Sequence, residues 1–172
     1  MEENKIVQNE EIRMAAEDVK RERLLQVFNI SMYGLIEGLW DLFGESSFAT
    51  INTVGDKVLK VVEKEVGFEV QGDNPKDILM EVNNLLVNKV GTMQSGMVVM
   101  DDDGKVSMAC EKCCLQEATK WLESEGVQPF ACLPMNIYAA ALRKKLNVRH
   151  KVLGRSWDDS SETCVISFQI LS

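Results

Sequence analysis

The sequence predicts an α+β fold, with N-terminal helices packed on an antiparallel sheet of about four strands and two helices inserted in the strand region. Through the first half of the chain, apolar residues recur at three- and four-residue intervals, which is typical of amphipathic helices. Near residue 96 the period changes to two, and an Asp-Gly turn separates two short apolar runs. Helices and strands are therefore segregated along the chain, as in α+β domains, and we expect residues 1–172 to form a single domain.

A long helical region is expected at the N-terminus. Residues 1–9 are expected to be frayed, and the helical pattern then continues through residues 10–45. Gly34 and Gly38 place small residues on one face, where a second helix can approach closely, and a bend at these glycines is the alternative interpretation. We expect this region to serve as a dimerisation element, which makes a homodimer the expected assembly.

Two shorter helices and four strands follow in the predicted order. Helices are expected over 46–66 and 75–89, the second with proline in its first turn. The next two segments, 96–100 and 105–110, have the pattern of a hairpin. The remaining elements are helices over 113–125 and 132–146 and a pair of strands that flank a polar turn at 158–162.

Composition limits the kinds of partner. The chain has 27 acidic and 19 basic residues and a net charge of −8, so we expect no nucleic-acid partner. No apolar run reaches the roughly 18 residues that a membrane span needs. The charged N-terminal segment lacks the apolar core of a signal peptide, which predicts a cytoplasmic protein.

Cysteine is the residue type that points to chemistry. Cys110, Cys113, Cys114 and Cys132 lie close together in the sequence, and Cys164 lies near its end. The spacing of Cys110 and Cys113 lets two thiolates converge on one ion, and soft thiolates favour zinc or an iron–sulfur cluster over hard ions. Zinc is the expected cofactor, because it commonly accepts ligands that are scattered along the sequence. A redox-active thiol pair and plain burial as small apolar residues are the alternatives.

Thiol reactivity is expected at the start of the 113–125 helix. A cysteine in a first helical turn has a lowered pKa, and the neighbouring Lys112 is expected to act in the same direction. A cysteine hydrolase also needs a base, and the single histidine, His150, is expected at an exposed strand edge. The sequence carries no complete catalytic signature, so a non-enzymatic role is favoured over an enzymatic one.

The C-terminal half resembles a known family. Cys132 opens a helix, a strand with Val148 and Val152 follows, and the chain ends in the strand Thr163-Cys164-Val165-Ile166-Ser167-Phe168. This order resembles the 4-vinyl-reductase domain family, over roughly residues 25–170. The TRAPP trafficking subunits are similar in helix and strand order, and the terminal segment is also similar to small cysteine-bearing hydrolases of aminothiazoline carboxylate.

The 4-vinyl-reductase resemblance implies an apolar pocket for hydrocarbon-like or aromatic ligands and a zinc site held by cysteines. Cys132 and Cys164 match the first and last metal ligands of that family. The family's intervening glutamate and cysteine have no counterpart in the stretch 153–157, so Cys110 with Cys113 or Cys114 is expected to replace them.

These observations predict a cytosolic sensor or carrier domain for a small hydrophobic ligand, with a cysteine-thiolate metal site. The alternatives are a cysteine-dependent hydrolase or thiol redox switch, and a non-catalytic assembly subunit. Bulky residues on the middle helices and last strands are the candidates for the pocket wall: Met32, Trp40, Phe48, Met97, Tyr138, Trp157 and Phe168.

Overall fold

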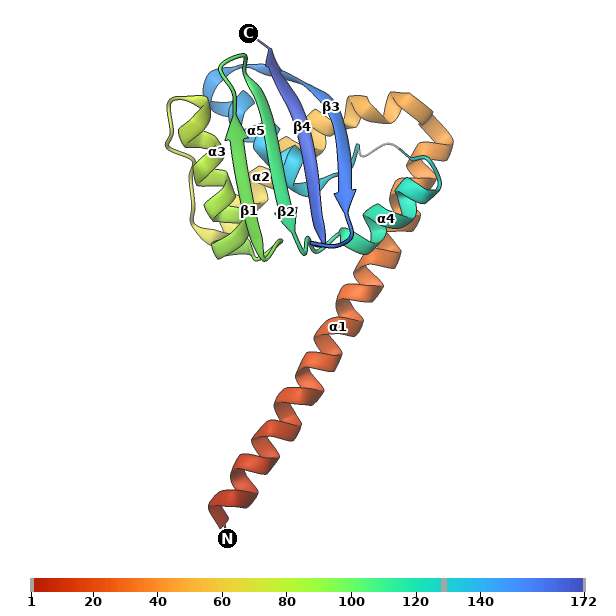
Figure 1. Cartoon of the computed structure of the whole chain (residues 1–172), viewed down its shortest axis with the longest axis vertical. Coiled ribbons are helices and arrows are strands. Elements are labelled where there is room, and N and C mark those ends of the chain that lie inside the picture. The colour runs from red at the N-terminus through yellow and green to blue at the C-terminus, as the bar shows by residue number, and fades with distance from the viewer. Residues whose placement is uncertain (1, 128–129, 172) are drawn as a thin grey trace.

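The computed structural model describes residues 2–127 and 130–171, with side chains from residue 13 onward. Helix α1 (Glu2–Phe43) is long, and its N-terminal half extends away from the rest of the domain (Figure 1). Its C-terminal part packs against α4 (Gln116–Ser124). The helix includes residues 2–9, which the sequence predicts to be frayed, and no glycine or proline interrupts it before Gly34.

Three more helices form the body of the domain. A 3₁₀ turn at Gly44–Ala49 leads into α2 (Thr50–Val66), so the α-helix begins later than residue 46, where the sequence predicts its start. Helix α3 (Pro75–Asn84) is capped by Asn74 and continues into a wider π-type turn, Leu85–Val90. Helix α5 (Leu133–Leu146) is buried on nearly every side through its first nine residues after Leu133, which explains why its sequence shows little amphipathic pattern.

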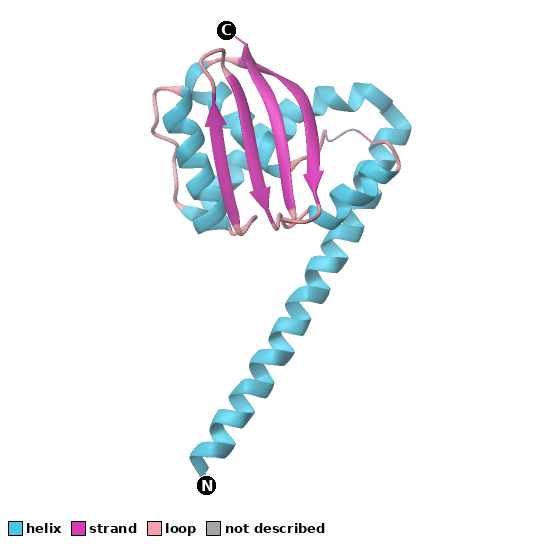
Figure 2. Cartoon of the chain, viewed as in Figure 1, coloured by secondary structure: helices cyan, strands magenta, loops and turns pink. Residues whose placement is uncertain are grey.

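The sheet has four antiparallel strands in the order β1-β2-β4-β3. These strands are β1 (Ser95–Met100), β2 (Lys105–Glu111), β3 (Arg149–Asp158) and β4 (Thr163–Leu171). Helices α2, α3 and α5 lie behind the sheet, on one of its faces (Figures 1 and 2). This arrangement confirms the predicted α+β class, with α4 and α5 as the two inserted helices.

Helices α2 and α5 pack closely because a glycine lies between them. A Cβ atom built on Gly55 would lie 2.5 Å from the carbonyl oxygen of Asn136 on α5. No larger side chain fits at this position without moving backbone. Gly34 and Gly38 of α1 differ from Gly55, because a Cβ atom on either would meet no described atom within 4 Å.

A β-bulge in β3 decides which of its side chains face the helices. Val152 pairs with Phe168 of β4, and the register then shifts between Val152 and Gly154. An uninterrupted alternation would point Gly154 and Ser156 inward. The bulge instead points Arg155 and Trp157 toward the helices.

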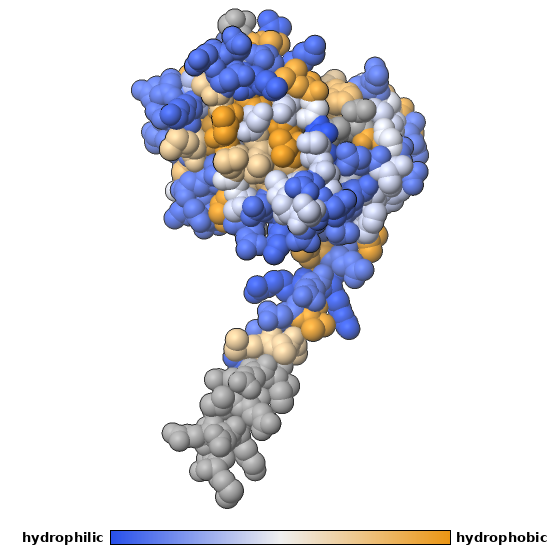
Figure 3. All heavy atoms as spheres, in the orientation of Figure 1, coloured by the Kyte–Doolittle hydropathy of each residue, from blue (hydrophilic) through white to orange (hydrophobic). Residues whose placement is uncertain are grey.

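The outer face of the sheet carries apolar side chains that no described helix covers. Met97 and Val99 of β1 and Leu153 of β3 are exposed there, and the space-filling view shows apolar residues across the centre of this face (Figure 3). Among the described residues, no helix combines the length and the apolar character needed to cross a bilayer.

Candidate functional site: a cavity lined by cysteines

Two cysteines face each other on neighbouring strands. Cys110 of β2 is the direct partner of Cys164 of β4, and both side chains are buried on the helix-facing side of the sheet. Trp157 of β3 is the partner of Cys164 on its other side. The three side chains therefore form a row across the sheet, near the end where β2 meets the turn that leads to α4.

The turn after β2 carries the next two cysteines. Lys112 adopts a left-handed conformation with φ of 46°, which reverses the chain directly after the strand. The N–H of Cys114 donates to the carbonyl oxygen of Thr92 at 2.7 Å. The N–H of Gln116 donates to the carbonyl oxygen of Cys113 at 2.9 Å. Because α4 begins only at Gln116, the expectation that Cys113 lies in the first turn of a helix is wrong.

A small cavity brings four of the five cysteines together. Cys110, Cys113, Cys132 and Cys164 all border it, and its volume is about 20 Å³. Cys132 reaches it from the N-cap position of α5. The rest of the wall is largely apolar and comes from α4, α5 and the two last strands: Leu115, Gln116, Thr119, Leu133, Pro134, Arg155, Trp157 and Ile166.

Cys113 also borders a second, open space. A groove of about 410 Å³ lies between α1 and the turn, and it is bordered by Leu25 and Asn29 of α1 and by Cys113, Cys114 and Trp121. Cys113 therefore separates the closed cavity from the groove. Cys114 faces the groove.

The thiols have very different acidities. Burial is the main cause that raises the pKa of Cys110 and that of Cys164, each to about 12. Burial likewise raises the pKa of Cys132 well above its ordinary value. These three side chains are held in the neutral thiol form at physiological pH.

Cys113 is the exception. A hydrogen bond with the Cys114 thiol is the main cause that lowers the pKa of Cys113, and the N–H of Leu115 and the charge of Arg155 act in the same direction. The same hydrogen bond raises the pKa of Cys114. The sequence predicts Lys112 as the cation that acts on Cys113, but Arg155 has this role because the bulge in β3 turns it inward.

The cysteines line one cavity without forming a closed set of ligands. Within residues 2–127 and 130–171, no group of three His, Cys, Asp or Glu side chains is close enough together to hold a metal ion. The donor types suit a soft metal, and binding one would require the sulfur atoms to draw closer together and to lose their protons.

Sequence analysis did not single out Arg155, although it borders this cavity and a smaller adjoining one. Its side chain is 5 % exposed. The signal in the sequence was a glycine within an otherwise alternating strand, which indicates a bulge and a change in the facing of the residues that follow.

Of the predicted pocket residues, Trp157 lies at the cavity. Trp40 packs against both Phe48 and Phe130, with ring centroids 6.1 Å apart in each pair. Met32 packs against the core. Tyr138 and Phe168 are completely buried.

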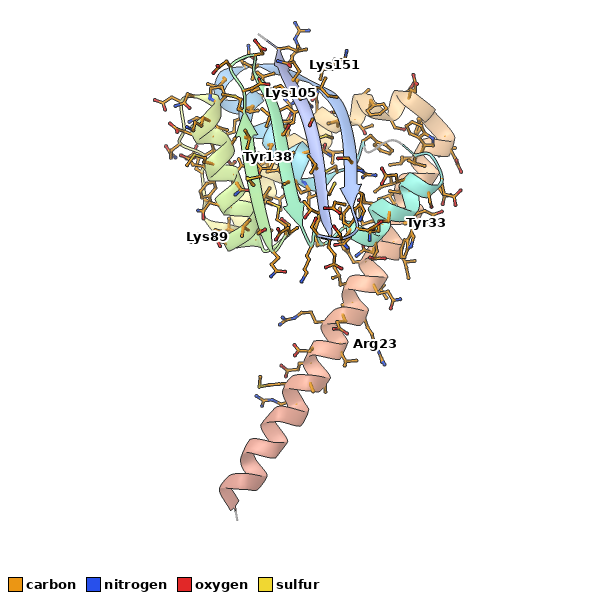
Figure 4. All side chains as sticks on the ribbon, in the orientation of Figure 1. Arg23, Tyr33, Lys89, Lys105, Tyr138 and Lys151 are labelled. Atoms are coloured by element: carbon orange, nitrogen blue, oxygen red, sulfur yellow. The ribbon has the colours of Figure 1, made fainter. Side chains whose placement is uncertain are left out.

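Tyr138 lies behind the sheet (Figure 4), where its hydroxyl donates to Asn83 at 2.8 Å. Met97 is 63 % exposed on the opposite face of the sheet.

His150 lies away from the cysteines. It is near the start of β3, opposite Ile170, whereas Trp157 and the cavity are near the other end of the strand. It is half-buried rather than exposed as predicted, and its ring packs edge-on against Phe168 with centroids 5.9 Å apart.

The fold and the site define a class: an α+β domain with helices on one face of a four-stranded antiparallel sheet and a thiol-lined cavity beneath the strands. Residues 26–169 match the family described as "Putative rubredoxin C-terminal domain", and the chain belongs to this family. A comparison with curated protein sequences found no match.

The solved structures that share the fold include the following two. The phenol-responsive sensory domain of the transcription activator PoxR, with phenol, has a TM-score of 0.50 at 10 % identity, over 82 % of this chain and 73 % of that one. Trafficking protein particle complex subunit 3 from Naegleria fowleri, covalently bound to palmitic acid, has a TM-score of 0.51 at 8 % identity, over 86 % and 95 % of the two chains. The predicted likeness to TRAPP subunits is thus confirmed at the level of the fold, and membership of the 4-vinyl-reductase family stays a prediction.

Proposed function

We propose that this chain is a sensor domain that binds a small hydrophobic or aromatic molecule in the cavity beneath the sheet. The observation that carries the proposal is that one largely apolar cavity is built from β2, the turn after it, α5 and the last two strands. The turn is also hydrogen-bonded to α1 through Asn29. A molecule that moves the cavity wall would therefore move the base of the long helix. The shared fold with a phenol-responsive domain supports this proposal.

The size of the cavity limits the ligand. A space of about 20 Å³ holds one water-sized occupant. A second cavity of about 10 Å³ adjoins it, and Leu115, Thr119, Cys132 and Arg155 border both. Rotation of these side chains would join the two spaces, so an aromatic ring is bound by displacing this wall.

A metal centre held by the thiols is the second candidate, and the four cysteines at one cavity favour it. Cys110, Cys113, Cys132 and Cys164 would hold the ion, and four thiolates are typical of zinc or iron–sulfur centres. The family description names rubredoxin, whose metal is iron, and zinc remains our prediction. Four thiolates around a divalent ion leave a net charge of about −2, which the neighbouring Arg155 would offset in part.

We further propose that the chain forms a homodimer in the cytoplasm. Leu24, Phe28, Leu35 and Leu42 are exposed along one face of α1, with Ser31 and Gly38 between them. Their intervals alternate between four and three residues, the repeat that packs against a second copy in a coiled coil. Five free cysteines suit a reducing compartment.

Fluorescence tests the binding proposal. Phenol titrated into the purified chain is expected to change the emission of Trp157 with saturation, and Trp157→Phe is expected to remove that signal. Trp40→Phe is the matched control, since Trp40 lies in the cluster with Phe48 and Phe130. A chain that shows neither a saturable change nor heat of binding does not have the proposed function.

Elemental analysis with a thiol count, before and after denaturation, tests the metal. One equivalent of metal with masked thiols supports the centre. Five titratable thiols without metal in a protein purified anaerobically exclude it.

A further inference from the structure

Arg155 is a buried cation with an unused donor. Its side chain is 5 % exposed, and its Nη2 makes one ion pair, 3.3 Å from the carboxylate of Glu123, which is itself 44 % exposed. The Nε atom is buried and meets no acceptor among residues 2–127 and 130–171. A guanidinium group can donate five hydrogen bonds, and removal of this charge from water is unfavourable unless anions or acceptors surround it.

This charge is directed at the cavity. Arg155 borders both of the adjoining cavities, whose other walls are thiols and largely apolar side chains. Its positive charge acts on two thiols of the same cavity, because it contributes to the lowered pKa of Cys113 and acts in the same direction on the pKa of Cys164. A buried, incompletely paired guanidinium at an apolar cavity is the arrangement expected of an anion receptor.

We propose that Arg155 gives this cavity a preference for small carboxylates, with the carboxylate on the guanidinium and an apolar body against Leu115, Leu133 and Trp157. This inference rests on the proposed binding function and names the class of ligand. A carboxylate matches the planar fork of the guanidinium and is ionised at neutral pH, whereas a phenol, with a pKa near 10, is not. Phosphate monoesters carry more charge than one cation can neutralise within apolar walls.

Glu123 is the internal competitor for the same cation. Its carboxylate lies at the surface end of α4 and pairs with Arg155 at a distance that leaves Nε unused. A ligand carboxylate could engage Nε without breaking this pair, but the two carboxylates on one guanidinium would repel each other. Removal of the Glu123 charge should therefore strengthen binding of a carboxylate and leave binding of a neutral ligand unchanged.

Benzoate and benzamide are suitable probes, because they share a shape and differ in charge. Calorimetry at pH 7 is expected to show that the wild-type chain binds benzoate at least tenfold more tightly than benzamide. Arg155→Met is expected to weaken benzoate binding at least tenfold and to abolish the preference for benzoate over benzamide. The benzoate affinity of Arg155→Lys should lie between those of the wild-type chain and Arg155→Met, because lysine keeps the positive charge and lacks the planar guanidinium group.

Glu123→Gln supplies a test that does not depend on how well an Arg155 variant folds. It removes a half-exposed carboxylate and is expected to raise the affinity for benzoate, with no change for benzamide. A wild-type chain that binds the two probes equally, or a Glu123→Gln chain with unchanged benzoate affinity, overturns the carboxylate preference. If the chain binds phenol but does not bind benzoate, the carboxylate preference is wrong and the proposed binding function stands. If none of the three compounds binds, the proposed function fails as well.

Discussion

The side-chain amide of Asn29 on α1 donates a hydrogen bond of 2.8 Å to the carbonyl oxygen of Cys114. Its oxygen accepts from the N–H of Ala118, at 3.0 Å, and the amide also donates to Leu25 within its own helix. Asn29 is only 3 % exposed. Because one buried amide binds both the cysteine turn and the first turns of α4, the long helix and the cavity wall are mechanically connected.

Loss of the Asn29 amide should destabilise the domain. Asn29→Leu leaves the N–H of Ala118 and the carbonyl of Cys114 buried without their partner, and each such group costs about 1–3 kcal/mol. We expect a decrease of about 2–4 kcal/mol in the free energy of unfolding, measured by urea denaturation. Asn88→Ala, in which an exposed asparagine is removed, is the control and should change stability by less than about 0.5 kcal/mol. Equal effects of the two substitutions would contradict the connection described above.

Cys113 should be the first thiol to react with iodoacetamide. Its pKa lies below the ordinary value of 9.0, whereas the pKa values of Cys110 and Cys164 are raised to about 12. In chelator-treated protein, its alkylation rate should rise with pH and reach half of its maximum below pH 9.0, as followed by peptide mass spectrometry.

The neighbours of Cys113 set this behaviour. Cys114→Ala removes the hydrogen bond that is the main cause of the lowered pKa, so it should move the midpoint of alkylation to higher pH. The lowered pKa also makes the free energy of unfolding depend on pH. Because the Cys113 thiolate is favoured in the folded state, it stabilises the fold above pH 9.0. That contribution is lost as the pH falls through the folded-state pKa. A midpoint that is unchanged in Cys114→Ala would refute the assignment.

Two glycine substitutions should have opposite effects. Gly55→Ala places a Cβ atom against the backbone of Asn136, and we expect a destabilisation of about 1–3 kcal/mol by thermal or urea unfolding. Gly34→Ala is the matched change in an open helical position, where alanine should stabilise the helix by about 0.5–1 kcal/mol. A stabilising Gly55→Ala would mean that α2 and α5 do not approach as closely as described.

The exposed face of α1 should decide the oligomeric state. Leu35→Glu places a charge in the middle of the face formed by Leu24, Phe28, Leu35 and Leu42, and it should convert a dimer to a monomer in light scattering coupled to size exclusion. Val61→Glu, at a similarly exposed position of α2, is the control and should leave the mass unchanged. A wild-type chain that is monomeric at high micromolar concentration would exclude the proposed homodimer.

Local patterns were sufficient for most of the secondary structure. The helix over 75–89 and the hairpin around Asp103-Gly104 could be predicted because a cap, a proline and a turn are each set by a few adjacent residues. The start of α4 could not be predicted in this way. The N–H of Cys114, in the turn before α4, donates to the carbonyl oxygen of Thr92, which lies about 20 residues earlier in the chain.

For the residues of the cysteine-lined cavity, too, the sequence could predict some positions and not others. Sequence spacing indicated Cys110 and Cys113 as neighbours, whereas the pairing of β2 with β4 places Cys164 beside Cys110. Arg155 was missed because its inward position depends on an irregular register between two strands. Met97 was named for its size, and its position on the outer face depends on which side of the sheet the helices cover.

The sequence by itself determined the class of the fold, the inward faces of most elements and the presence of several thiols, because helix and strand periodicity and turn chemistry act over a few residues. The tertiary structure alone decided that four of those thiols and one arginine share a single cavity. Strand pairing, the bulge in β3 and the packing of α5 bring together residues that are far apart along the chain, and no local pattern records these contacts.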